Sequence, residues 1–392
     1  MVRTEVVKEA MLSLVRASLW GTHCNLEGKT CSHELFHNVM QLAMEQAVVG
    51  LISQGMMNAR VKMESPEDAM DLYGFVRTIR HRNEEVNGAV LKLCTLLQKE
   101  GIRFMVVKGQ MMAALYPDPG LRQSGDIDFL CHPDDWDKAM SLIRRELNPK
   151  VDDSGIGKDL AFDAGNFHYE MHQRLTDLEY ARYRRDWEDV VMPESWEHPY
   201  SININGQDIP TLAPTYTALY VFVHIIGHML YEGIGLRQFC DWAVLLAQQV
   251  KDPSSAPPMG ANEVKSKECQ DVLDVEILKR HLKGIGLEKA YSGIGAVLTD
   301  FLGLPEEKFP FPITASDHRR APKVLKNIID RGNFGYHLKY LQESGPIHAL
   351  QLLWIDGRQA WLLGHYAPRE SLWRILNLFQ GWGIKLWRAC KH

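Results

Sequence analysis

The chain changes its pattern of hydrophobic and polar positions along its length, and these changes divide it into three parts. In the first part, apolar residues recur at helical spacing as far as Leu19, and Gly21 ends the predicted helix. Further helices are expected over 33–54 and 66–100, the second with charged residues along one face. We therefore expect residues 1–100 to form an N-terminal helical region.

Short apolar runs separated by turns follow over residues 101–212. Such runs, when they alternate with helical stretches, are typical of a mixed sheet flanked by helices. The turn of the hairpin expected here is the dipeptide Asn205-Gly206, which favours the left-handed backbone of a tight turn. The expected elements are strands over 104–107, 126–130 and 166–174, a helix over 133–147, a charged helix over 178–190 and the hairpin over 201–210.

Helical spacing returns at Pro214, a residue that suits the first turn of a helix. Residues 213–392 should form a C-terminal helical region, interrupted by a Pro- and Ser-rich loop over 251–262 and by a break over 331–335. The fold class predicted is α+β (mixed α/β), with a sheet core at 101–212 flanked by the two helical regions. Further helices in this last region are expected over 263–304, 316–331 and 337–365.

Composition narrows the class of protein. The 392 residues carry a net charge of -5, which argues against a generic nucleic-acid scaffold. The seven cysteines are scattered without a C-x-x-C pair, a pattern that fits reduced thiols better than a disulfide framework. The first residues are too charged for a signal peptide, and no apolar run reaches membrane-spanning length. A cytoplasmic protein is expected.

Two aspartates carry the most specific chemistry in the chain. Asp126 and Asp128 lie two residues apart at the second strand of the predicted sheet, so their side chains point to the same face. Two carboxylates side by side are unfavourable unless a cation neutralises them. Because hard oxygen ligands suit such ions, the pair indicates a site for Mg²⁺ or Mn²⁺.

The turn before this strand supplies groups that would attract an anion. Gly109 allows close approach of the backbone to a ligand, and a helix starting at Gln110 would present unpaired N–H groups. Lys108 would add a point charge for phosphate, and Arg122 a forked contact to the same anion. An anion site beside metal-binding carboxylates indicates phosphoryl or nucleotidyl chemistry.

The strand predicted over 166–174 places three polar side chains on one face. His168, Glu170 and His172 alternate with apolar residues. A zinc site built from these three residues is the weaker interpretation. It lacks the helical His-Glu-x-x-His arrangement and leaves the aspartate pair unexplained.

Taken together, the Lys-Gly turn, short helix, Tyr-Pro, Arg and Asp-Ile-Asp resemble the uncharacterised bacterial nucleotidyltransferase-like family of the DNA polymerase β-type superfamily. Most of that superfamily has Gly-Ser at the first turn, where this chain has Lys108-Gly109 and a longer gap to the aspartates. The resemblance implies a small nucleotidyltransferase sheet with three metal ligands, Asp126, Asp128 and Glu170. The nucleotide-binding residues that it implies, or that lie beside the motif, are Lys108, Gly109, Arg122, Ser124, His172, Arg237 and Asp241.

A second helical motif shows the same resemblance. His224 and His228 are one turn apart on a helix, and Gly-Leu-Arg237 precedes Asp241 by one turn. By the resemblance these residues line the nucleotide or acceptor side of a cleft. The alternative is that the histidines face the core and that Arg237 and Asp241 form an intrahelical pair of small energetic value. The sequence leaves both open.

The final segment, 372–392, is rich in Trp, aliphatic and basic residues and contains no Asp or Glu. This composition is typical of a helix that makes peripheral contact with a membrane. A helix docked on the protein body is the favoured interpretation, because Gly381 and Gly383 interrupt the pattern.

The function expected is Mg²⁺-dependent transfer of a nucleoside monophosphate from an NTP to an unknown hydroxyl or phosphate acceptor, with release of pyrophosphate. A small molecule, a glycan or a protein could be the acceptor. Two alternatives use the same fold: a non-catalytic nucleotide-binding or interaction protein, and a metal-dependent phosphohydrolase with water as acceptor.

Overall fold

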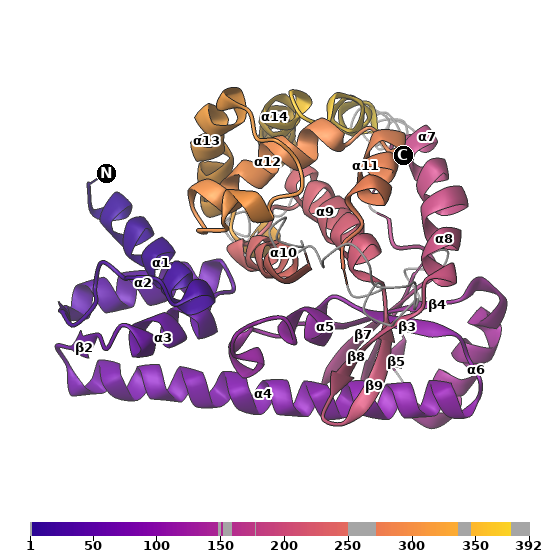
Figure 1. Cartoon of the computed structure of the whole chain (residues 1–392), viewed down its shortest axis with the longest axis horizontal. Coiled ribbons are helices and arrows are strands. Elements are labelled where there is room, and N and C mark those ends of the chain that lie inside the picture. The colour runs from indigo at the N-terminus through magenta and orange to yellow at the C-terminus, as the bar shows by residue number, and fades with distance from the viewer. Residues whose placement is uncertain are drawn as a thin grey trace, which may run out of the picture.

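The computed structural model describes residues 2–147, 150–151, 159–176, 178–249, 272–335 and 346–377. Helices predominate, and a mixed sheet lies between a long helix on one side and a group of helices on the other (Figure 1). The predicted α+β class is confirmed. The division at residues 100 and 212 into three regions stays a prediction.

The N-terminal part forms four helices: α1 (Val2–Trp20), α2 (His33–Glu45), α3 (Val49–Asn58) and α4 (Pro66–Lys99). The single helix expected over 33–54 is wrong, because the chain turns between α2 and α3 at Ala47, whose φ is +56°. Two short strands, β1 (Thr30–Cys31) and β2 (Lys62–Met63), pair in parallel just before α2 and α4. This pairing sets the starts of the two helices side by side.

The main sheet has five strands in the order β3-β4-β7-β6-β5. β4 and β7 are parallel, and the other neighbours are antiparallel. Because β4 pairs with β7, Asp128 lies opposite Glu170 in the register. The strands are β3 (Phe104–Val107), β4 (Ile127–Cys131), β5 (Lys150–Val151), β6 (Asp159–Ala164) and β7 (Phe167–His172).

Side-chain alternation gives the sheet two different faces. Phe129, Tyr169 and Met171 are buried with α4 and with α6 (Trp136–Leu147). The hairpin of β8 (Tyr200–Ile204) and β9 (Gln207–Thr211) completes this cluster, and its predicted Asn-Gly turn is confirmed. The polar residues of β4 and β7 therefore point to the opposite face, toward the C-terminal helices. Short elements that join these parts are α5 (Gly109–Ala113), a 3₁₀ turn (Pro119–Leu121), a second 3₁₀ turn (Pro133–Asp135), α7 (Ala181–Asp186), a π-helical turn (Trp187–Val191) and α8 (Met192–Glu197).

The C-terminal helices pack around α9 (Pro214–Leu230), which begins at the predicted proline and is buried along most of its length. Trp242 donates to the Tyr291 hydroxyl at 2.9 Å in the aromatic core of this group. The predicted break at 331–335 is present, with Gly332 in the left-handed region. The predicted loop at 251–262 and parts of the helices expected over 263–304 and 337–365 lie outside the described residues. The other helices are α10 (Leu236–Gln249), α11 (Val275–Gly284), α12 (Glu288–Asp300), a 3₁₀ turn (Glu306–Lys308), α13 (Ala315–Arg331), α14 (Pro346–Gly364) and a helical segment over 368–377.

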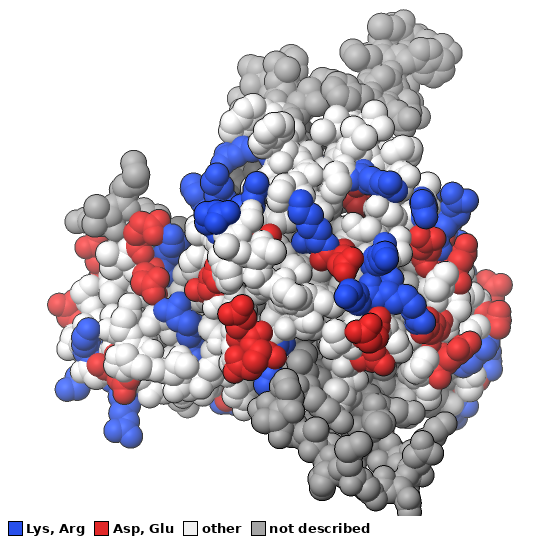
Figure 2. All heavy atoms as spheres, turned by 45° about the horizontal axis from the view of Figure 1, so that its top comes forward, with Lys and Arg blue, Asp and Glu red and all other residues white. Residues whose placement is uncertain are grey.

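Two surface properties bear on partners and location. Among the helices of the described ranges, none has both the length and the apolar character needed to cross a bilayer. On the face shown in Figure 2, basic and acidic side chains are interspersed. The membrane contact considered for 372–392 stays a prediction, since 378–392 lie outside the described residues, and so does a cytoplasmic location.

One buried carboxylate should make stability depend on pH. Glu370 is 2% exposed and accepts the backbone N–H groups of Glu179 and Tyr180. Burial raises its pKa from 4.5 to about 7, against the effect of these hydrogen bonds. The folded protein therefore holds a proton that the unfolded chain has lost. This stabilisation is full below pH 4.5 and disappears as pH rises through about 7.

We expect Glu370 to lower the free energy of unfolding by up to about 3 kcal/mol between pH 4.5 and 7.5. Replacing it in Glu370→Gln removes this part of the pH dependence, because the amide does not titrate. Urea unfolding of both proteins at the two pH values measures the difference. Equal pH dependence of the free energy of unfolding in the two proteins would show that the pKa of Glu370 is the same in the folded and unfolded states.

Candidate active site

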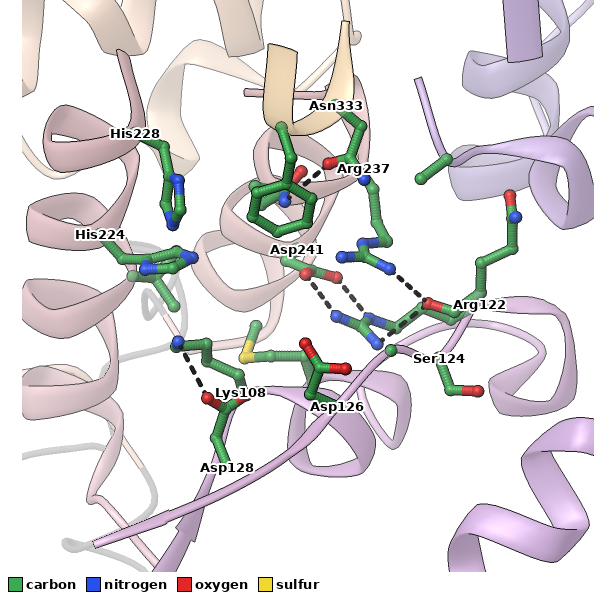
Figure 3. A pocket seen from close by; sticks show the side chains of 18 of the residues that line it. Lys108, Arg122, Ser124, Asp126, Asp128, His224, His228, Arg237, Asp241 and Asn333 are labelled. Carbon is green, nitrogen blue, oxygen red and sulfur yellow. Dashed lines mark hydrogen bonds and ion pairs between the residues drawn. The ribbon is translucent and has the colours of Figure 1, made fainter. Parts of the chain in front are cut away.

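Three carboxylates lie along one wall of a cavity between the sheet and the C-terminal helices. Asp128 is on β4 and Glu170 is its register partner on β7, while Asp126 comes just before β4. All three line a cavity of about 790 Å³ (Figure 3). The structure thus brings together the three residues that the sequence pointed to as metal ligands.

Asp128 is held between two basic side chains. Its Oδ1 atom lies 3.3 Å from Lys108 Nζ and 3.1 Å from His172 Nε2. Burial alone would raise the pKa of Asp128, but the charge of Lys108 and the hydrogen bond from His172 outweigh burial and lower it. Asp128 is therefore anionic although it is only 8% exposed.

The pKa of Glu170 is shifted in the opposite direction from that of Asp128. Burial raises its pKa, and the charge of the neighbouring Asp128 raises it further. Metal-ligating atoms of Asp128, Glu170 and His172 all lie within 4.8 Å of one another, so this cluster could hold a metal ion. Asp126 lines the same cavity but is outside that cluster.

His172 lies between Asp128 and Asp159 and contacts both. Its Nδ1 atom lies 2.8 Å from Asp159 on β6, and its Nε2 atom contacts Asp128. Burial would lower its pKa, but hydrogen bonds with the two aspartates raise it to about 9. His172 was expected to contact the nucleotide, yet it is not among the side chains that line the cavity. The sequence reading missed Asp159 because it contained no strand at 159–164.

The Lys-Gly turn places a cation at the cavity floor. Lys108 has a φ of +53° and Gly109 a φ of +42°, so both lie in the left-handed region that strongly favours glycine. The Lys108 ammonium lies 5.1 Å from the centre of the Tyr220 ring on α9, in addition to its contact with Asp128. A strained lysine backbone held in this way is a feature of functional sites.

Arg122 lines the cavity, but its guanidinium is already paired with a carboxylate. Its guanidinium makes a forked pair with Asp241, with Nε and Nη2 each 2.7 Å from a carboxylate oxygen. The Tyr116 hydroxyl donates to the same Asp241 at 2.6 Å, and all three side chains are buried. This network joins the loop before β4 to α10. The intrahelical Arg237–Asp241 pair considered from the sequence is thus replaced by a pair between distant segments.

Arg237 and Ser124 line the cavity, and each holds a buried polar atom without a hydrogen-bond partner in the described part of the chain. Arg237 Nη1 donates to the backbone oxygen of Gln123 at 3.1 Å, but its buried Nε atom has no hydrogen-bond partner among the described residues. Burial and the charge of Arg122 lower the pKa of Arg237. The Ser124 hydroxyl is also buried and unpaired within the described part of the chain.

The two histidines left open by the sequence line the cavity rather than the core. His224 and His228 stack edge to face with ring centres 4.2 Å apart, and Phe334 packs on His228 at 5.0 Å. Asn333 joins this wall and accepts from Gln238 at 3.1 Å. Sequence reasoning singled out the break at 331–335 but assigned no role to Asn333 or Phe334. It missed Gln238, although the residue is next to Arg237.

The chain was compared with protein-family models, solved structures and curated proteins. A family model described as "Uncharacterised nucleotidyltransferase" matches residues 32–256, from the start of α2 past the end of α10. Among solved structures, the chain resembles an antigenic nucleotidyltransferase-like protein from Paracoccidioides brasiliensis. The identity is 15% and the TM-score 0.33, over 56% of this chain and 93% of the other. The search of curated proteins gave no match.

Proposed function

Because the chain belongs to the family of uncharacterised nucleotidyltransferases, we propose that it transfers a nucleoside monophosphate from an NTP to a hydroxyl or phosphate acceptor and releases pyrophosphate. The observation that carries this proposal is the gathering of three carboxylates, a lysine and an arginine around one cavity. Negative and positive groups around one cavity suit a substrate that brings its own phosphates and a divalent cation.

The donor set supports Mg²⁺ or Mn²⁺ as the cofactor. Asp128 and Glu170 are like charges at opposed register positions, an arrangement that a divalent cation would stabilise. Their oxygens, with those of Asp126, are the hard ligands that such ions prefer. When bound there, the ion would neutralise charge on the triphosphate and on the departing pyrophosphate.

The protein's own groups divide between donor and acceptor. Lys108, Ser124 and Arg237 would bind the triphosphate, since all three line the cavity and Lys108 and Arg237 bring positive charge to it. Glu170, whose pKa burial raises, is suited to take the proton from an acceptor hydroxyl. His224 and His228 would then face the acceptor. Arg122 and Asp241 pair with each other, so we assign them a positioning role and not direct contact with the substrate.

Calorimetry with each NTP and Mg²⁺ tests the proposal. The wild type should bind one NTP in a metal-dependent manner, and Asp126→Ala/Asp128→Ala should weaken binding at least about tenfold, which corresponds to about 1.4 kcal/mol. Asp137→Ala is the matched control, because Asp137 is an exposed carboxylate on α6, on the other side of the sheet. A folded wild type that binds none of the NTPs would contradict the proposal and favour an interaction protein.

Labelled NTP distinguishes transfer from hydrolysis. Transfer places the labelled monophosphate on an acceptor and releases pyrophosphate only when the acceptor is present. Free labelled nucleotide formed at the same rate without any acceptor would indicate a phosphohydrolase instead.

A further inference from the structure

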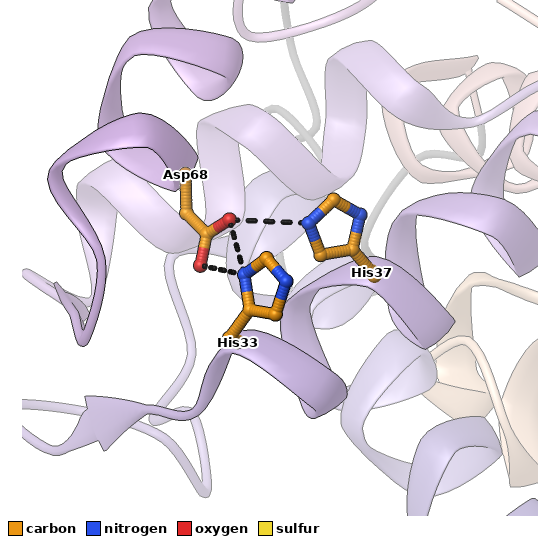
Figure 4. A group of neighbouring side chains, drawn as sticks. All are labelled: His33, His37 and Asp68. Carbon is orange, nitrogen blue, oxygen red and sulfur yellow. Dashed lines mark hydrogen bonds and ion pairs between the residues drawn. The ribbon is translucent and has the colours of Figure 1, made fainter.

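A second group of metal-ligating side chains lies where α2 and α4 begin (Figure 4). His33 is the first residue of α2, His37 follows one turn later, and Asp68 is in the first turn of α4. His33 Nδ1 lies 3.0 and 3.1 Å from the two carboxylate oxygens of Asp68. His37 Nε2 lies 3.2 Å from one of them. Three potential ligand atoms thus converge on one point.

The backbone holds these three residues in place without help from a ligand. The parallel pairing of β1 with β2 brings the starts of the two helices together. The Ser65 hydroxyl then caps α4 by accepting the backbone N–H of Asp68, and Glu64 accepts the backbone N–H of His33 at 2.9 Å. A preorganised site of this kind loses little conformational entropy when an ion binds.

The charge at this place is incompletely balanced. The side chain of Asp68 is 1% exposed, and a buried carboxylate is unfavourable without compensation. In the described part of the chain, the ion-pair partners of Asp68 are the two imidazoles, which carry a full charge only when protonated. The N-termini of α2 and α4 add only partial positive charge. A divalent cation between the three side chains would complete the balance.

We propose that His33, His37 and Asp68 form a site for a transition-metal ion of the Zn²⁺ type, separate from the active site. Zinc bonds of about 2.0–2.1 Å in a tetrahedron hold ligand atoms about 3.3 Å apart, close to the distances found here. Two histidines one turn apart on a helix match this ion, and imidazole nitrogens favour it over Mg²⁺. The His33 and His37 side chains are 62% and 52% exposed, so water can take the fourth position.

The ion would tie together two helices that both support the active site. Met44 on α2 and Ala47 just beyond it line the nucleotide cavity. On α4, Asn83 donates to the backbone oxygen of Arg122 at 2.9 Å, on the loop that leads into β4. Binding at the helix starts therefore stiffens the frame of the cavity, and its first effect is on stability.

Zinc titration of the chelator-treated full chain tests this site. Calorimetry should show one equivalent of Zn²⁺ that depends on these residues, and Co²⁺ should give the intense visible bands of a tetrahedral complex. Zn²⁺ should also raise the Tm. His33→Ala and His37→Ala should each weaken this binding at least tenfold and abolish the rise in Tm. His81→Ala, which removes an exposed histidine paired one turn away with Glu85 on α4, should change nothing.

A comparison with Asp128→Asn separates the two metal clusters. Zinc held by the carboxylates of the active site would be lost in Asp128→Asn and kept in His37→Ala. Unchanged zinc binding and Tm in both histidine variants would overturn the proposal, as would a wild type with no zinc-dependent rise in Tm. Loss in the histidine variants with retention in Asp128→Asn supports it.

Discussion

Asp128→Asn should lower kcat/KM for nucleotidyl transfer about a thousandfold or more while the protein stays folded. The amide has nearly the same shape as the carboxylate but removes the negative charge that faces Lys108 and His172. It also removes one of the charged oxygens expected to bind the metal ion. Single-turnover assays with labelled NTP and saturating Mg²⁺ measure the loss.

The same change at Asp163 is the matched control for this experiment. Asp163 is a more exposed carboxylate on β6 of the same sheet, paired with His168. Asp163→Asn should keep transfer within about threefold of the wild type, because it touches neither the cavity nor Asp128. If Asp128→Asn retained more than a tenth of the wild-type rate, Asp128 would not be a ligand of the catalytic ion.

The largest effect on stability is expected at the buried pair between Arg122 and Asp241. Asp241→Ala leaves the guanidinium of Arg122 without its forked partner at a position only 4% exposed. Breaking such a pair by removing one member costs about 3–5 kcal/mol. Urea unfolding of the wild type and the variant measures the change. Tyr116→Phe removes one neutral donor to the same carboxylate and should cost about 1 kcal/mol.

A double variant separates the pair from its surroundings. In Arg122→Met/Asp241→Leu neither charge remains buried, so we expect most of the stability lost in Asp241→Ala to return. Activity should stay low in the double variant, because the loop before β4 loses its connection to α10. A stability loss in the double variant equal to the sum of the losses in Arg122→Met and Asp241→Leu alone would show that the residues do not act as a pair.

The carboxylate wall of the site could be predicted from the sequence because it depends on short-range geometry. Alternation along a strand places Glu170 and His172 on one face of β7, and the short distance along the chain keeps Asp126, just before β4, at the same cavity as Asp128. The pairing of β4 with β7 is a long-range event, and no local pattern determines it. The resemblance to a family supplied that step by requiring a third carboxylate on a later strand.

Other features were wrong or absent because tertiary contacts decide them. Ala47 gives no sequence signal for a turn, yet its left-handed backbone ends the helix expected over 33–54. Asp159 was missed although Leu160 and Phe162 alternate with Asp159 and Asp163 along its strand, so this signal was present in the sequence. Arg122 is equally suited to a phosphate or a carboxylate. Asp241 becomes the partner of Arg122 because α10 packs beside the loop that carries Arg122, and no local sequence pattern indicates this packing.

The position of Asn333 and Phe334 bears on how a protein with the proposed function would change its selectivity over evolution. Both belong to the cavity wall, but they lie beyond residues 32–256, which match the family model. The carboxylates and the Lys-Gly turn lie inside that segment. Substitutions in the C-terminal segment can therefore reshape one side of the cavity while the half that we propose binds the metal ion is inherited unchanged. Under the proposed function, new acceptors would become accessible while the carboxylates stay the same.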